Sequence, residues 1–230
     1  MRKSFDDQLR MLSDELIHMG TLCENAIASA TEAMKKHDLM LARRAIAADQ
    51  AIDQEEREIE RLCLKLLLQQ QPVARDLRQI SSALKMITDM ERIGDQAADI
   101  SEIVLYMPET GLIPELHEIG AMAQATASMV RRSVEAYAKR DLSIAGQVIA
   151  DDDQVDALFE SVKGELIYMI AQTPDCGKQA LDLLMIAKYL ERIGDHATNI
   201  AEWVEFSILG RHPEYDEEDM VENREGYSEK

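Results

Sequence analysis

The chain has 230 residues, of which 46% are hydrophobic and only 4% aromatic, so Leu, Ile, Ala and 13 Met must fill the core. That composition favours packed helices, and ten Gly and five Pro are too few for the many turns of an all-β fold. The net charge of −19 argues against binding to nucleic acid or anionic lipid, since both are bound through clustered Lys and Arg.

The sequence also predicts where the protein resides. It begins without an apolar signal region, and no run of 18 apolar residues occurs, so no membrane insertion is expected. Cys23, Cys63 and Cys176 fall within helical patterns with no Cys-x-x-Cys spacing. They are interpreted as small core residues in a reducing compartment, which predicts a cytoplasmic protein.

The first half of the chain predicts three helices. Apolar residues at steps of three and four mark the first helix over 5–34. Asp38 can cap a second helix that reaches Leu66. Pro72 marks the next turn, and a third helix follows over 77–98. The segment 107–114, with prolines at both ends, is the expected boundary in the middle of the chain.

The second half repeats this scheme. Met-Glu-Arg-Ile-Gly-Asp at 90–95 returns as Leu-Glu-Arg-Ile-Gly-Asp at 190–195, and Lys-His-Asp-Leu at 36–39 returns as Lys-Arg-Asp-Leu at 139–142. Helices are predicted over roughly 114–139, 141–172 and 174–209. The expected fold is all-α, with two tandem three-helix antiparallel bundles at 1–110 and 111–210. Residues 211–230 form an acidic tail that is predicted to be disordered.

Acidic residues interrupt the apolar stripes as pairs four positions apart, which places both carboxylates of a pair on one helix face. The eight acids are Asp49, Asp53, Glu91, Asp95, Asp152, Asp156, Glu191 and Asp195.

Folding the chain at its prolines brings these pairs together. Asp53 and Glu91 lie equally far from Pro72, so an antiparallel hairpin places them at one level. The turn at Thr173 and Pro174 does the same for the second unit. The sequence therefore predicts two four-carboxylate clusters.

Such clusters repel unless some acids are protonated or cations neutralise them. Carboxylates without Cys or paired His favour Mg²⁺, Mn²⁺, Ca²⁺ or iron, with Zn²⁺ also possible. Gly94 and Gly194 lie between the acids and would allow a close approach to the backbone. The alternative is a solvated acidic face with surface ion pairs.

Other candidates carry weaker signals. Asp99 and Asn199 lie one turn beyond the clusters and either extend them or serve as surface or capping residues. His196 is rotated off the ligand face, which favours a supporting or surface role. Glu15 and His18 have the Glu-x-x-His spacing of di-iron bundles, but the second unit has no counterpart, which favours a chance match.

Several segments together resemble one known family. They are Pro-Val-Ala-Arg-Asp-Leu-Arg at 72–78, the segment at 90–95, and Tyr-Leu-Glu-Arg-Ile-Gly-Asp-His-Ala-Thr-Asn-Ile-Ala-Glu at 189–202. From about residue 5 to 210 the chain is similar to the PhoU family of phosphate-transport accessory regulators.

The resemblance implies a homodimeric negative regulator of phosphate uptake and of the phosphate-starvation response. It implies contacts with the ATPase subunit of a phosphate ABC transporter and with a sensor histidine kinase, at the inner face of the membrane. It also implies metal clusters of Fe, Mn, Mg or Zn on the eight acids named above.

The sequence leaves three alternative functions to be tested. The first is a metal-binding regulatory adaptor without enzymatic activity. The second is a multinuclear-metal oxidase or phosphatase that uses the clusters as Lewis acids, although neither a glycine-rich phosphate loop nor a nucleophile–His pair is evident. The third is an inert helical scaffold.

Overall fold

The computed structural model describes residues 2–70, 72–108 and 117–211, and these form six long helices without a strand. The helices are α1 (Arg2–Lys36), α2 (Leu39–Gln70), α3 (Ala74–Tyr106), α4 (His117–Lys139), α5 (Leu142–Gln172) and α6 (Gly177–Leu209), with a 3₁₀ turn at Pro174–Cys176 before α6. None of these helices is long and apolar enough to cross a membrane. The predicted disordered tail and most of the predicted boundary segment lie outside the described residues.

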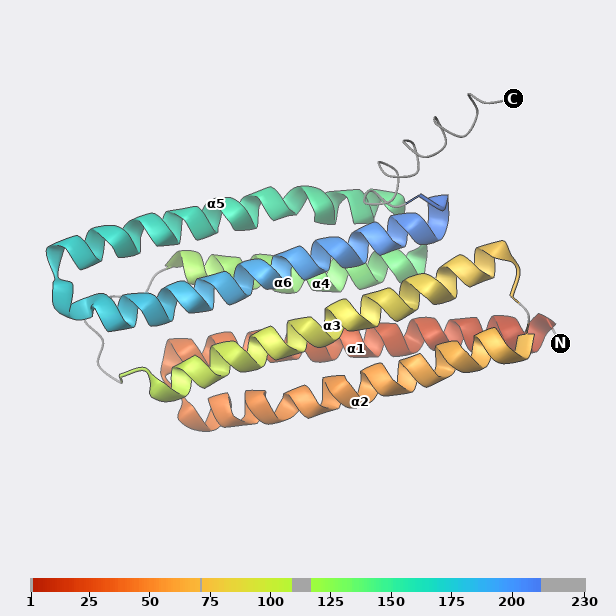
Figure 1. Cartoon of the computed structure of the whole chain (residues 1–230), viewed down its shortest axis with the longest axis horizontal. Helices are drawn as coiled ribbons and strands as arrows, with labels where there is room; N and C mark the ends of the chain where they lie inside the picture. Colours follow the sequence, from red (N-terminus) through yellow and green to blue (C-terminus); the bar gives the residue numbers. More distant parts are fainter. Residues whose placement is uncertain (1, 71, 109–116, 212–230) are drawn as a thin grey trace, which may run out of the picture.

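The helices run side by side along the long axis of the molecule (Figure 1). Within each unit, consecutive helices pack as neighbours, and the first also contacts the third. The two units meet through α3 against α6 and α1 against α4. The chain therefore places α1, α3, α4 and α6 at the centre, with α2 and α5 on opposite outer edges (Figure 1).

One hydrophobic core runs through both units. Leu16, Met19 and Cys23 of α1 are fully buried. Their repeat equivalents on α4, which lie 103 positions later in the chain and include Met122, are buried as well. The antiparallel bundles expected from the sequence are present, but they fuse along their inner helices and bury their apolar faces against each other. Cys63 and Cys176 are also buried, as predicted.

The turns within each unit repeat the same local chemistry. Asp38 Oδ1 accepts hydrogen bonds from the backbone N–H groups of Met40 and Leu41, both at 3.0 Å. Asp141 Oδ1 accepts in the same way from Ser143 N at 2.8 Å and from Ile144 N at 3.2 Å. Each aspartate thus satisfies two N–H groups at a helix start that have no partner inside the helix.

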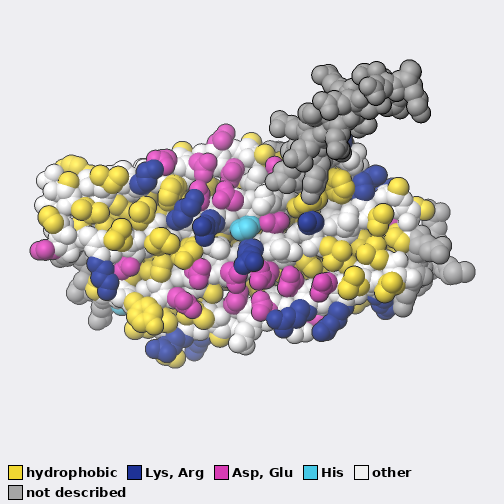
Figure 2. Space-filling view, viewed as in Figure 1, with side chains coloured by type: hydrophobic (Ala, Val, Ile, Leu, Met, Phe, Trp, Pro, Cys, Tyr) yellow, Lys and Arg dark blue, Asp and Glu magenta, His cyan; other side chains and the backbone are white. Residues whose placement is uncertain are grey.

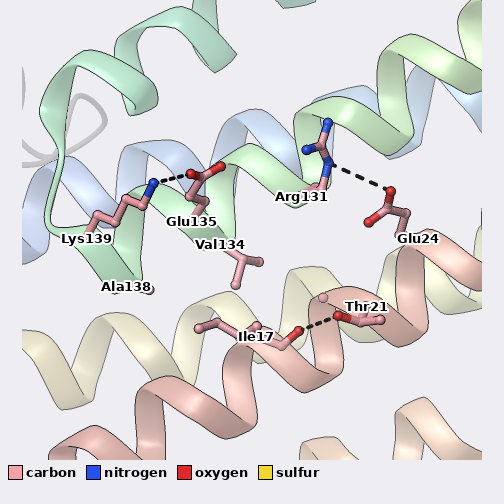
Figure 3. A pocket seen from close by; sticks show the side chains of 9 residues that line it. Ile17, Thr21, Glu24, Arg131, Val134, Glu135, Ala138 and Lys139 are labelled. Atoms are coloured by element: carbon pink, nitrogen blue, oxygen red, sulfur yellow. Dashed lines mark hydrogen bonds and ion pairs between the residues drawn. The ribbon is translucent and has the colours of Figure 1, made fainter.

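The duplicated units differ most clearly between α1 and α4. On one side a cavity of about 320 Å³ opens above Ile17, Val134 and Ala138, with ion pairs at its rim (Figure 3). On the equivalent side a Cβ added to Gly120 would lie 3.2 Å from Lys35 Nζ. Lys35 of α1 is the repeat equivalent of Ala138 of α4, which lines the cavity. The longer lysine side chain therefore covers the space next to Gly120, whereas the space next to Ala138 stays open.

Candidate metal centres

Acidic side chains gather in the middle of the face formed by α2, α3, α5 and α6 (Figure 2). The eight acids selected from the sequence lie on these four helices, four on the α2–α3 hairpin and four on the α5–α6 hairpin. Most are half-buried, whereas Asp156 and Asp195 are exposed. The first and second clusters below denote the four acids of each hairpin.

In the first cluster, Asp49 carries the strongest perturbation. Burial, and then repulsion from Asp95 and Asp53, raises the pKa of Asp49 to about 6. Burial and the charge of Asp95 also raise the pKa of Glu91, and Asp53 contributes to that repulsion. The hairpin thus brings together the pairs that equal spacing from Pro72 predicts, Asp49 with Asp95 and Asp53 with Glu91.

The second cluster repeats this electrostatic pattern. Burial, followed by repulsion from Asp195 and Asp156, raises the pKa of Asp152 to about 6, and Glu191 adds to the effect. Burial and Glu191 raise the pKa of Asp195. The predicted partners Asp152 and Asp195 are therefore close enough to repel each other.

Basic side chains partly neutralise the outer acids. Arg57 Nη2 donates to Asp53 Oδ2 at 3.4 Å. Arg92 Nη1 donates to Asp95 Oδ2 at 3.1 Å, and its Nε lies 3.5 Å from Glu91 Oε2. In the second cluster, Lys188 Nζ pairs with Glu191 Oε2. Three acids of the first cluster and one of the second thus take part in the ion pairs that the alternative interpretation proposed.

The two inner aspartates are different. Asp49 Oδ1 and Asp152 Oδ1 are each shielded from solvent and have no hydrogen-bond partner of good geometry, although Thr198 lies close enough to the Asp152 carboxyl to lower its pKa slightly against the larger effect of burial. A buried polar atom without a partner costs about 1–3 kcal/mol, more when it is charged. Both units leave the same atom unsatisfied, which an acidic face fully solvated by water would not do.

Glycine makes this burial possible. A Cβ on Gly94 would lie 2.8 Å from Asp49 Oδ1 and 2.9 Å from Ile52 Cδ1. The corresponding contact of Gly194 with Asp152 Oδ1 would be 3.3 Å. The predicted close approach at these glycines is therefore between the helix backbone and an aspartate oxygen.

These observations test whether a cation fits. The donor set is carboxylate oxygen, as hard cations require, and each cluster holds one buried oxygen without a partner. Over residues 2–70, 72–108 and 117–211, no three Asp, Glu, His or Cys side chains converge closely enough to hold an ion as they stand. Binding would require Asp53, Asp95 and Glu191 to separate from Arg57, Arg92 and Lys188, which the solvent-exposed side chains of these three basic residues permit. With that separation, the residues fit a hard cation.

The structure also places the weaker candidates. Asn199 Nδ2 donates to Asp89 Oδ1 at 3.2 Å, and His196 Nδ1 lies 2.9 Å from the same oxygen, so both bridge α6 to α3. Tyr189 of α6 donates a hydrogen bond to the Asp99 carboxylate of α3. The charge of Asp99 also contributes to the raised pKa of Asp49.

Sequence reasoning missed two residues. Asp89, the acceptor for His196, gave no signal in the sequence. Glu55 is only 8% exposed. Its spacing of three from Ile52 and four from Ile59 could have identified it, because that spacing is typical of a buried helix face.

Asp53 lies nearer the edge than the sequence predicts. The apolar steps of three and four predict a buried stripe on α2 through Leu39, Ala42, Ile46, Asp49 and Asp53. Beyond Ala42, however, the buried stripe passes through Ala45, Ile52 and Glu55. Both stripes keep a spacing of seven residues, from 46 to 53 and from 45 to 52, so the predicted stripe is displaced by one residue, about 100° around the helix. Asp53 is consequently half-buried beside the core.

Comparison with known proteins agrees with this architecture. A family model described as the PhoU domain matches twice, over residues 16–104 and 119–204. A Clostridium acetobutylicum protein named "Phosphate-specific transport system accessory protein PhoU homolog" is 36% identical over 211 residues, covering 91% of this chain and 96% of its own length. A Xylella fastidiosa protein of the same name is 37% identical over 209 residues, covering 90% and 88%.

Solved structures show the same fold. The crystal structure of PhoU from Pseudomonas aeruginosa superposes with a TM-score of 0.85 at 32% identity, covering 90% of this chain and 100% of that one. The phosphate transport system regulatory protein PhoU from Streptococcus pneumoniae gives 0.83 at 27% identity, with coverage of 90% and 98%. With both helical repeats matched and two relatives above 30% identity across nine-tenths of its length, the chain belongs to the PhoU family.

Proposed function

We propose that this chain is a regulatory accessory protein of a phosphate transport system, which restrains phosphate uptake and the phosphate-starvation response. The observation that carries the proposal is the match of both repeats to one family, whose members are named accessory or regulatory proteins of phosphate transport. The partners we propose are the ATPase subunit of a phosphate ABC transporter and a sensor histidine kinase. The protein would act in the cytoplasm as a homodimer, held at the membrane through these partners.

We further propose that both acidic clusters bind metal ions. Asp49, Asp53, Glu91 and Asp95 would hold the first group, and Asp152, Asp156, Glu191 and Asp195 the second. When bound, Fe, Mn, Mg or Zn ions supply positive charge that offsets the repulsion between these carboxylates. Asp49 and Asp152 are the innermost ligands, since each presents a shielded oxygen without a partner. Through these acids the chain would tie α2 to α3 and α5 to α6.

The regulatory proposal is tested in a strain whose own gene for this protein is deleted. The parent chain should restore repression of a phosphate-starvation reporter at high phosphate and return phosphate uptake to its normal rate. The tagged chain should capture the transporter ATPase from the same cells. Deletion that leaves the reporter and uptake unchanged would refute the regulatory function.

The metal proposal is tested by elemental analysis after purification without chelator. The parent should contain metal, and the Asp49→Asn/Asp53→Asn and Glu191→Gln/Asp195→Asn variants should each lose the share bound by one cluster. Asp153→Asn is the matched control, because Asp153 is an exposed acid next to Asp152 on α5. Equal, near-zero metal in parent and variants would exclude both clusters as metal sites.

An enzymatic function would show itself in a separate assay. Metal-loaded protein is screened for phosphatase activity and for O₂ consumption. We expect neither activity above that of the doubly substituted variants. Turnover that disappears with the clusters would replace the adaptor with a metal-dependent enzyme.

A further inference from the structure

A third polar group lies between α1 and α2, apart from the two acidic clusters. Glu55 of α2 is 8% exposed, and its Oε1 is shielded from solvent without a hydrogen-bond partner. Its Oε2 lies 3.9 Å from His18 Nε2 of α1. The Glu15 carboxyl lies within hydrogen-bonding reach of the same side chain. Two carboxylates and an imidazole are therefore neighbours, although they do not converge closely enough to hold an ion until side chains such as His18 rotate.

The second unit shows that the fold does not need this acid. The residue 103 positions after Glu55 is Leu158, which packs against the core. The residue equivalent to His18 is Ala121, and only Glu15 keeps its type, as Glu118. Since a leucine fills this position in the same kind of helix pair, a buried carboxylate here lowers stability unless something neutralises it.

The spacing of the donors suits a metal ion. Glu15 and His18 are three residues apart, so they lie on the same face of α1, and Glu55 faces them from α2. Two ligands of one tetrahedral Zn²⁺ lie about 3.3 Å apart, given metal–ligand bonds of about 2.0 Å. The distance of 3.9 Å between His18 Nε2 and Glu55 Oε2 exceeds that ligand–ligand distance by a fraction of an ångström. The His18 side chain is 57% exposed, so it can rotate toward Glu55, and an ion can enter from solvent.

The donor types also narrow the choice of ion. A single imidazole nitrogen with carboxylate oxygens is typical of sites for first-row divalent transition metals, whereas Mg²⁺ and Ca²⁺ prefer oxygen alone. The nearby charge of Glu58 adds to the repulsion at Glu55 and would further favour a cation.

We propose that Glu15, His18 and Glu55 bind one divalent transition-metal ion of the Zn²⁺, Mn²⁺ or Fe²⁺ class. This site lies between α1 and α2, in the first unit alone. The eight acids of the two clusters lie instead on the α2–α3 and α5–α6 hairpins. It does not depend on the proposed regulatory function, so either can fail without the other.

The experiment isolates this site in the full chain. Asp49→Asn, Asp53→Asn, Glu191→Gln and Asp195→Asn are combined to disable the acidic clusters, and the protein is stripped with chelator. Zn²⁺ is then titrated by calorimetry, and Co²⁺ is followed by its visible absorption. We expect one equivalent of Zn²⁺ to bind tightly, with Co²⁺ giving absorption bands that Zn²⁺ abolishes.

Three further substitutions in this background identify the ligands. His18→Ala and Glu55→Leu should each weaken Zn²⁺ binding at least tenfold and remove the Co²⁺ bands. His117→Ala should leave both unchanged, because His117 is an exposed histidine at the start of α4. Without metal, Glu55→Leu should melt at the same temperature as its background or higher, as expected from the leucine of the second unit.

The proposal is overturned if the background protein binds no Zn²⁺, or if neither His18→Ala nor Glu55→Leu changes its affinity. Should Glu55→Leu fail to fold, the His18→Ala result decides, because removing an exposed imidazole leaves the core intact.

Discussion

Asp49 and Asp152 occupy equivalent positions in the two units, and each combines a shielded oxygen without a partner with repulsion from neighbouring acids. Four other acids of the clusters have Arg or Lys partners, for example Asp53 with Arg57 and Glu191 with Lys188. The pKa is raised most at the inner aspartate of each cluster, and to a lesser extent at Glu91 and Asp195. That makes the inner aspartates the residues at which metal removal and pH should act most strongly.

Chelator-treated protein should lose stability as the pH rises through about 6. In the folded chain the pKa of Asp49 and of Asp152 is raised from 3.8 to about 6, so the folded state holds protons that the unfolded chain releases. This stabilisation is complete below pH 4 and is lost between pH 4 and 6. Replacing Asp49 and Asp152 with Asn should stabilise the metal-free protein at pH 7.5 by about 1 kcal/mol per site, after allowance for solvent screening of half-buried groups.

The measurement is urea unfolding of parent and Asp49→Asn/Asp152→Asn protein from pH 4 to pH 8 in the presence of chelator. The two curves should coincide near pH 4, separate between pH 4 and 6 and remain a constant distance apart above pH 6. The exposed control Asp153→Asn should follow the parent at every pH. A constant difference across the range would show that these carboxyls titrate alike in folded and unfolded chains.

Gly94→Ala tests the close approach of α2 to α3. The new Cβ would lie 2.8 Å from Asp49 Oδ1 and 2.9 Å from Ile52 Cδ1, so these buried side chains must rotate or the helices must shift apart. We expect a loss of about 1–3 kcal/mol in the free energy of unfolding. Gly194→Ala should lose less, since its nearest contact is 3.3 Å.

The control for both is Gly146→Ala on α5. No atom lies within 4 Å of its added Cβ, and alanine is a better helix former, so this variant should gain about 0.5–1 kcal/mol. Denaturant unfolding at pH 7.5 measures all three variants. Equal effects at Gly94 and Gly146 would contradict the tight packing.

At the scale of helices, the sequence was sufficient to predict all six elements and their antiparallel order. Apolar steps of three and four, Asp38 and Asp141 as caps and the prolines at 72 and 174 fix where helices begin and turn. Because a hairpin aligns residues equally distant from its turn, the pairing of Asp49 with Asp95 also followed from sequence alone. These are local signals, which act within a few turns of the chain.

The rotation of a long helix about its axis was less predictable. On α2 the steps of three and four placed Ile46 and Asp53 on the buried face, whereas Ala45, Ile52 and Glu55 occupy it. An error of one residue rotates a side chain by about 100°. The burial of Glu55, and with it the group formed with Glu15 and His18, was missed for this reason.

The cap of α5 gives a prediction at this scale. Asp141→Ala removes the acceptor for two backbone N–H groups, so we expect a loss of about 1 kcal/mol. Asp141→Asn should retain most of the stability, because its amide oxygen can still accept. Thermal unfolding of both variants is the measurement, and equal losses would show that charge at the helix start matters more than the hydrogen bonds.

At the scale of the whole molecule, the packing of one unit on the other could not be read from sequence. The repeat predicts two similar bundles but not which faces meet, because that depends on contacts between residues a hundred positions apart. His196 illustrates this: its helical position suggested a supporting or surface role, while its partner Asp89 lies on the other unit, 107 residues away. Tyr137 likewise donates to the Gln79 carbonyl oxygen across the seam at 3.0 Å.

Metal should stabilise the entire chain if the acidic clusters bind it. A ligand that binds only the folded state at a hundred times its Kd stabilises by about 2.7 kcal/mol per site. For a domain of this size, that corresponds to a rise in Tm of roughly 5–10 °C. Calorimetry of chelated protein with and without added Mn²⁺ measures the shift. Asp49→Asn/Asp152→Asn should reduce it, and an unchanged shift would place the bound ions elsewhere.

The shared core leads to a prediction about the separate halves. Residues 1–110 alone would expose the faces of α1 and α3 that pack against α4 and α6, and residues 111–211 would expose the complementary faces. Neither half should be a folded monomer, since each loses part of one continuous core. Mixed together, the halves should form a helical 1:1 complex whose unfolding, like that of the intact chain, is a single transition.

Circular dichroism and light scattering distinguish the possibilities. A fully helical, monomeric half that unfolds cooperatively would mean that each repeat carries a sufficient core of its own. In that case the contacts of α3 with α6 and of α1 with α4 would join two independent domains. The single transition expected of the intact chain would then resolve into two, and a substitution such as Gly94→Ala would lower only the first of them.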